Sequence, residues 1–172
     1  MTRVLAGVGD MLQARSPQRL YWIHIVWIVN VFVYLIVAWW IFYRWRYQQS
    51  WTFYLFIFVL ISPTILYLAS LLLFPQETVS GELVDYRTHF YSNHRAFFVL
   101  MALFGPIDMI DSALKGLAHF RALGWTYTAS SALFLLGLTT AAITRNERYH
   151  GFYAIFFLVQ TLAVSFVLYR TL

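Results

Sequence analysis

The feature that most constrains this chain is a succession of five long apolar stretches separated by short polar segments. They cover about residues 20–43, 51–74, 96–114, 122–143 and 151–169. Each stretch has roughly the twenty apolar residues that an α-helix needs to cross the ~30 Å hydrocarbon core of a bilayer. The sequence therefore predicts an all-α fold, a polytopic transmembrane helical bundle with five spans.

The composition excludes an ordinary soluble domain. Of the 172 residues, 61% are hydrophobic and 11% are charged, whereas soluble domains carry about 25% charged residues. The basic residues occur singly or in pairs between the apolar stretches and form no basic face that would bind nucleic acid. We therefore expect the lipid bilayer as a partner and no nucleic acid. The chain has no cysteine, so thiolate metal sites and disulfides are excluded.

Residues 1–19 precede the first span and mix apolar with charged side chains. Val4, Val8 and Met11 recur at intervals of four and three residues, and Leu5 lies next to Val4. This spacing is typical of a short amphipathic helix in the membrane interface. A disordered segment is the alternative. Both readings remain open from the sequence.

Charge and aromatic residues bear on the orientation of the spans. With five spans the termini lie on opposite sides, and a cytoplasmic N-terminus places seven of the twelve Lys and Arg residues on the cytoplasmic side. The positive-inside rule favours this orientation weakly. Trp and Tyr residues, Trp45 among them, gather toward the ends of the first span, as interfacial aromatic belts do.

The third span carries two carboxylates in apolar surroundings. Asp108 and Asp111 are three residues apart and share a helix face, which Lys115 continues four residues later. Ionisable groups at membrane depth are costly and usually functional, and neighbouring carboxylates readily share a proton or a cation. These three residues are the candidate ion or proton site.

A structural role for the same carboxylates is the alternative. In that reading each is paired within the protein, with Lys115 as the partner of Asp111 and with Ser112, Asn30 or Gln160 as the partner of Asp108. Asn30 lies near the middle of the first span and Gln160 near the middle of the fifth. We expect both to form interhelical hydrogen bonds, worth about 1 kcal/mol each.

Two prolines interrupt the second and third spans. Pro63 and Pro106 both fall near mid-span, where the missing backbone N–H predicts a helix kink. Interrupted helices near the bilayer midplane are typical of transporter binding sites. The prolines therefore favour a site close to the two carboxylates.

Small residues recur every four positions in the fourth span, at Gly124, Thr128 and Ala132 and again at Gly137 and Ala141. Such spacing lets helices approach closely. We expect this helix to lie centrally in the bundle.

The segment from Pro75 to Arg95 combines acids with histidines, and we expect a short interfacial helix there. Asp85 and His89 are four residues apart, with His94 nearby, so they could hold a metal ion on a helix. The chain has no HExxH or EF-hand pattern, and interfacial histidines also serve as polar anchors. No cofactor is predicted.

Several motifs together resemble a family of uncharacterised bacterial inner-membrane proteins with several spans. They lie at residues 21–24, 39–40, 51–53, 72–75, 85–86, 95–98 and, as a DxxDxxxKG motif, 108–116. The resemblance implies a bacterial cytoplasmic (inner) membrane and adds no catalytic residue. His94-Arg95-Ala96 departs from the basic pair typical of that family. Its members often have a further apolar helix before the segment similar to Arg3–Arg19, so a six-helix relative is expected.

The size and composition favour a scaffold or accessory subunit of a membrane complex over an enzyme, either as a homo-oligomer or bound to larger partners. A small proton- or cation-coupled transporter or channel that uses Asp108 and Asp111 is the alternative. A membrane enzyme or metal site on the histidine and acid face is the second alternative.

Overall fold

The computed structural model describes residues 2–13, 17–75, 83–114, 116, 121 and 123–168. Its elements are, in order, α1 (Thr2–Gln13), β1 (Gln18–Arg19), α2 (Trp22–Tyr43), the 3-10 helix η1 (Arg44–Tyr47), α3 (Phe53–Leu73), β2 (Val84–Asp85), α4 (Tyr86–Ala102), α5 (Phe104–Leu114), α7 (Gly124–Ile143) and α8 (Glu147–Leu168). Five helical segments are long and apolar enough to cross a membrane, α4 and α5 together forming one of them. The predicted all-α fold is confirmed.

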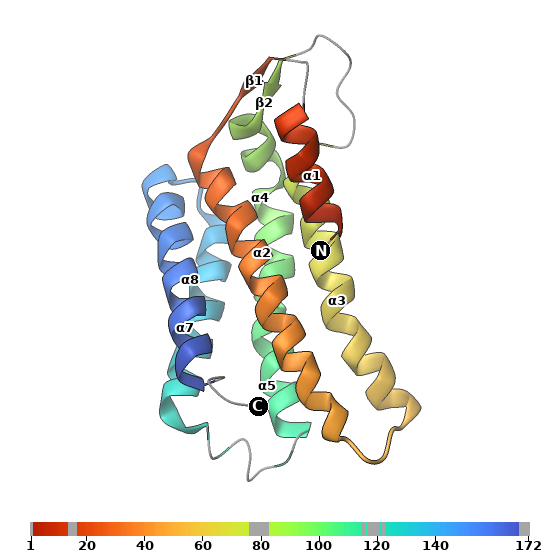
Figure 1. The fold of residues 1–172 in the computed structure, drawn as a ribbon. Helices are drawn as coiled ribbons and strands as arrows, with labels where there is room; N and C mark the ends of the chain where they lie inside the picture. Colours follow the sequence, from red (N-terminus) through yellow and green to blue (C-terminus); the bar gives the residue numbers. More distant parts are fainter. Residues whose placement is uncertain are drawn as a thin grey trace.

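The spans form an up-and-down bundle (Figure 1). We name its two ends by what they carry. The α1 end holds α1, the β1–β2 pair and the connection between α7 and α8, and the η1 end holds η1 and the ends of α5 and α8. Helix α4 packs against α2, α3 and α7, so it lies inside the bundle.

The third span begins at Tyr86, well before the predicted start at residue 96. Residues 86–95 are therefore the first turns of α4 and not a separate interfacial helix. The buried side chains Phe90, His94 and Phe97 recur at helical spacing and pack inward. Polar residues between them, such as Ser92 and Arg95, lower the mean hydropathy of this segment. Hydropathy alone therefore does not reveal the buried stripe.

The two prolines have different effects. Between α4 and α5 the helix breaks at Leu103, because Pro106 has no N–H to donate to the carbonyl of Ala102. Helix α3, in contrast, continues through Pro63. Beside that proline the hydroxyl of Thr64 donates to the carbonyl of Leu60 at 2.8 Å.

The core centres on Trp27 of α2, which is fully buried. Its ring centroid lies 4.8 Å from that of Phe98 and 5.2 Å from that of Phe157, so it joins α2 to α4 and α8. One turn further along, the Asn30 side-chain amide donates to the carbonyl of Ala154 at 2.8 Å. Aromatic packing and this interhelical bond hold α2 and α8 together.

The α1 end is closed by local contacts of the N-terminal segment. Residues 2–13 form a helix, which is the first of the two alternatives for this segment. Val4 is buried, and a Cβ on Gly7 would lie 2.5 Å from the ring of Phe74. Only glycine lets α1 approach the end of α3 this closely.

The small residues of α7 divide into two groups. Gly137 lies under the ring of Tyr153 from α8, and Ala141 is fully buried. Gly124, Thr128 and Ala132 are exposed. Only the second group packs within the bundle as expected, and the first faces outward.

We predict that Gly137→Ala destabilises the bundle. An added Cβ would overlap the Tyr153 ring, whose hydroxyl donates to the carbonyl of Phe134 at 3.1 Å, and overpacking of this kind costs about 1–3 kcal/mol. Unfolding in detergent micelles measures the loss. Gly9→Ala is the control, because nothing lies within 4 Å of its Cβ and alanine favours a helix. Equal stability of Gly137→Ala and the parent chain would contradict the packing described.

Candidate functional site

Asp108 lies in α5 and is held by a side chain of α7. Its Oδ2 accepts a hydrogen bond of 2.7 Å from the hydroxyl of Tyr127, and the hydroxyl oxygen of Ser112 lies 3.1 Å from the same tyrosine oxygen. The single tyrosine hydroxyl hydrogen goes to Asp108, so Ser112 donates to Tyr127. Ser112, a predicted partner of Asp108, thus reaches it through Tyr127.

Asp111 is buried one turn nearer the η1 end. Its Oδ1 accepts a hydrogen bond of 2.8 Å from the indole N–H of Trp45 in η1. Trp45 is itself buried and packs against Trp51, with ring centroids 5.8 Å apart. The bond joins the end of the first span to the third. Lys115, the predicted partner of Asp111, lies outside the described residues.

The depth of Asp108 follows from its neighbours. Asp108 and Asp111 line a cavity of about 40 Å³ together with Ala38 of α2 and Ser62 of α3. Ala38 and Ser62 lie close to the middles of their spans, Trp22–Tyr47 and Phe53–Leu73. Asp108 itself lies six residues before the end of its span, Tyr86–Leu114, so the carboxylate is within the span but in the half nearer the η1 end.

A second cavity, of about 80 Å³, also borders Asp108 and lies between α2, α5, α7 and α8. Its polar lining comprises Asp108, Tyr127, Ser130, Ser131, Gln160, Thr161 and Ser165. At ~30 Å³ for each water molecule, the larger cavity has room for about two waters and the smaller for about one. Asp108 thus borders two neighbouring spaces that water can occupy.

The predicted interhelical polar residues bond to backbone carbonyls. Asn30 is bonded to Ala154 and not to either aspartate. The amide nitrogen of Gln160 donates to the carbonyl of Ser130 at 2.9 Å, and Gln160 lines the larger cavity with Asp108. Carboxylate, hydroxyl and amide oxygens together suit a proton, a water molecule or a hard cation.

The structure does not bring Asp85, His89 and His94 together as a metal site. Asp85 is the N-cap of α4, with its carboxylate accepting from the backbone N–H of Arg87 at 3.0 Å and from the hydroxyl of Thr88 at 2.9 Å. The hydrogen bond from Thr88 holds the pKa of Asp85 below its usual range. The ring of His89 donates instead to the carbonyl of Leu72, at 3.0 Å.

His94 and His150 also donate to carbonyls. His94 Nδ1 lies 2.6 Å from the carbonyl of Tyr91, and His150 Nε2 lies 2.9 Å from that of Thr144. Leu72 and Thr144 end their helices, where carbonyls lack intrahelical donors. In the part of the chain that is described, no three His, Asp or Glu side chains are placed to hold a metal ion. The geometry favours a role in which histidines donate hydrogen bonds to backbone carbonyls near helix ends.

Sequence reasoning missed both side chains that hold the acidic pair. Trp45 was assigned to the interfacial belt, and Tyr127 was not singled out. A signal for Tyr127 exists, because Asp108 lies six residues before the end of α5 and Tyr127 three residues after the start of α7. Neighbouring antiparallel helices place such residues at similar depth. The fully buried His150 was likewise treated as part of a link between spans.

No protein-family model, curated protein or solved structure matches the chain. The resemblance to a bacterial inner-membrane family therefore stays a prediction. What can be inferred about function rests on the geometry of the site.

We predict that Asp85→Ala lowers the thermal unfolding temperature by a few degrees, because it removes the cap of α4. Asp85→Asn should retain the cap, since asparagine caps equally well. At neutral pH the ionised Asp85 contributes to stability, and this contribution is lost as the pH falls through its lowered pKa. Asp85→Asn should lack that pH dependence. Equal losses in both variants would show a role for the carboxylate beyond capping.

Proposed function

We propose that this multi-span membrane protein passes a proton or a small cation across the bilayer, with Asp108 as the group that binds it. The observation that supports this is that Asp108 lines two cavities, one that reaches Ser62 of α3 and one that reaches α7 and α8. A group that carries an ion has to be reachable from more than one side.

The energetics of a charge at this depth support the proposal. A carboxylate at the centre of a membrane helix costs about 3 kcal/mol on insertion scales. Asp108 lies nearer the end of its span, Tyr86–Leu114, so its cost is smaller, and binding a proton or cation removes the charge. The hydroxyl of Tyr127 donates to Asp108 at 2.7 Å and stabilises the ionised form. Asp108 is therefore stabilised both as an ionised carboxylate, by Tyr127, and as a neutral group with its proton or cation bound. A group that binds and releases an ion needs both states.

The larger cavity provides a polar route from Asp108 toward the η1 end. Its lining passes from Gln160 to Ser165 along α8, a helix that ends at Leu168. Hydroxyl and amide groups along this route can hold water or replace part of the hydration shell of an ion. The smaller cavity is lined by both Asp108 and Asp111, and Asp111 is held there by the indole N–H of Trp45.

We further propose that the α1 end faces the cytoplasm of a bacterial cell and that the η1 end faces outward. Arginines support this orientation under the positive-inside rule. The α1 end has Arg19, Arg87, Arg145 and Arg148, whereas the described arginine side chains near the η1 end are Arg46 and Arg121. The polar cavity beside Asp108 would then open on the outer side.

We predict that Asp108→Asn abolishes ion flux. Asparagine keeps the shape of the side chain and can still accept from Tyr127, but it cannot carry a proton or neutralise a cation. Flux is measured in vesicles that contain a dye sensitive to protons, sodium or potassium, with a gradient of the matching ion imposed in each case. The expected rate is that of protein-free vesicles. The control is Asp10→Asn, which removes an exposed carboxylate of α1.

Either of two results would contradict the ion-handling proposal. The first is flux in Asp108→Asn equal to that of the parent chain. The second is flux in the parent chain no higher than in protein-free vesicles for all three ions.

A scaffold or accessory subunit is the second candidate function. It is favoured by Gly124, Thr128 and Ala132, which lie four residues apart on α7 and are exposed. Small residues at this spacing allow a helix of another chain to approach closely. The same face would serve a homo-oligomer or a larger membrane complex.

We predict, for this second function, that Ala132→Leu separates the assembly because the larger side chain keeps the partner helix away. Native mass spectrometry of protein released from its own membrane should then show a chain of 20.2 kDa alone, where the parent chain shows a multiple or an added protein. Ala163→Leu makes the same change on the exposed side of α8 and should leave the assembly intact. A monomeric parent chain would count against the scaffold.

A further inference from the structure

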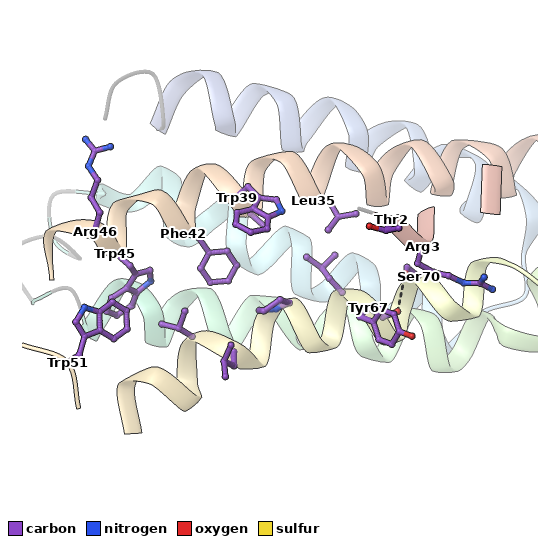
Figure 2. A pocket seen from close by; sticks show the side chains of 15 residues that line it. Thr2, Arg3, Leu35, Trp39, Phe42, Trp45, Arg46, Trp51, Tyr67 and Ser70 are labelled. Atoms are coloured by element: carbon purple, nitrogen blue, oxygen red, sulfur yellow. Dashed lines mark hydrogen bonds between the residues drawn. The ribbon is translucent and has the colours of Figure 1, made fainter. Parts of the chain in front are cut away.

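A groove with a volume of about 700 Å³ lies between α2 and α3. Leu35, Trp39 and Phe42 of α2 line one side, and Leu66 and Tyr67 of α3 line the other (Figure 2). Both helices are candidate spans, so this α2–α3 groove faces the hydrocarbon of the bilayer. Its walls are largely apolar and aromatic.

The dimensions of the groove limit what can occupy it. From Leu35 to Arg46 along α2 the rise is about 17 Å, which gives the groove a mean cross-section of about 40 Å². A hydrocarbon chain with neighbours about 4–5 Å away needs about 20 Å². The α2–α3 groove therefore has room for two hydrocarbon chains side by side.

An arginine lies at each end of the groove, and the two differ in their partners (Figure 2). The guanidinium of Arg46 lies over the rings of Tyr43 and Tyr47, 3.6 and 4.4 Å from their centroids, and donates to the Tyr47 hydroxyl. Arg3 lies 6.0 Å from the centroid of Phe74. Among the described residues, no carboxylate forms an ion pair with Arg3.

An anionic group would complement the Arg3 end of the groove. The guanidinium fork matches a phosphate, and such charge-assisted hydrogen bonds are among the stronger ones in proteins. The first turn of α1, from Thr2, lies at the same end, so the positive end of the α1 dipole adds to the attraction. Two hydrocarbon chains joined to a phosphate describe a phospholipid.

We propose that the α2–α3 groove is a binding site for one phospholipid of the surrounding bilayer, with its acyl chains along Trp39 and Phe42 and its phosphate on Arg3. This inference is independent of ion transport. It also places the lipid beside the acidic site, because Ala38 and Phe42 line both the groove and the smaller cavity at Asp108. Trp45, which donates to Asp111, lines the groove as well.

The test is native mass spectrometry of the full chain released from nanodiscs that contain equal amounts of phosphatidylglycerol and diacylglycerol with the same acyl chains. We expect one phosphatidylglycerol to remain bound. Arg3→Gln should lower the retained fraction about tenfold, the effect of losing a hydrogen bond to a charged group. Arg148→Gln removes an exposed arginine remote from the groove and should change nothing.

Filling the groove tests the position of the acyl chains. Ala38→Phe occupies the space on the α2 side and should displace the lipid while Arg3 is intact. Leu60→Phe makes a milder change at a groove residue that is 46% exposed, so it keeps the test valid if Ala38→Phe fails to fold. Both variants should also lower the retained phosphatidylglycerol.

Several results would overturn the proposal. Equal retention of diacylglycerol and phosphatidylglycerol would show that phosphate is not recognised. Unchanged retention in Arg3→Gln, or in both groove-filling variants, would place the lipid elsewhere. A lipid-free mass of two chains that is lost in Ala38→Phe would identify a second copy as the occupant.

Discussion

Hydrocarbon offers no hydrogen-bond partners, so the polar groups within the spans of this bundle depend on one another. Asn30 and Gln160 donate to backbone carbonyls of neighbouring helices, and Asp108 and Asp111 accept from Tyr127 and Trp45. Each bond is directional and joins two different elements. Together they fix the rotation of α2 against α8, of α8 against α7, and of α5 against α7 and η1.

Aromatic side chains pack the helices closely together, in addition to these hydrogen bonds. Lipid tails are as apolar as the helices, so helices gain by packing closely and not by escaping water. Trp27 fills the space between α2, α4 and α8, and Gly137 lets Tyr153 lie directly on α7. At the α1 end, His89 and His150 donate to the carbonyls with which α3 and α7 end. These bonds give the carbonyls near the ends of α3 and α7 the donors that their own helices lack.

The acidic site and the α2–α3 groove are neighbours in this arrangement. The smaller cavity at Asp108 shares Ala38 and Phe42 with the groove, and Trp45 contributes both to the groove and to the hydrogen bond at Asp111. A phospholipid in the groove would cover one side of the carboxylates, and the polar cavity between α7 and α8 would leave the other side open. The two proposals thus concern neighbouring spaces that meet at Ala38 and Phe42 of α2.

The sequence by itself determined the number of spans and the presence of polar groups in apolar surroundings, because hydropathy is a local property that needs no neighbour. It predicted an effect of both prolines, but the helix breaks before Pro106 and continues through Pro63. Only the tertiary structure decided that Tyr127 and Trp45 hold the aspartates and that the third span starts at Tyr86. Such pairings depend on how helices are rotated and offset against one another, which side-chain packing between residues distant in the sequence sets.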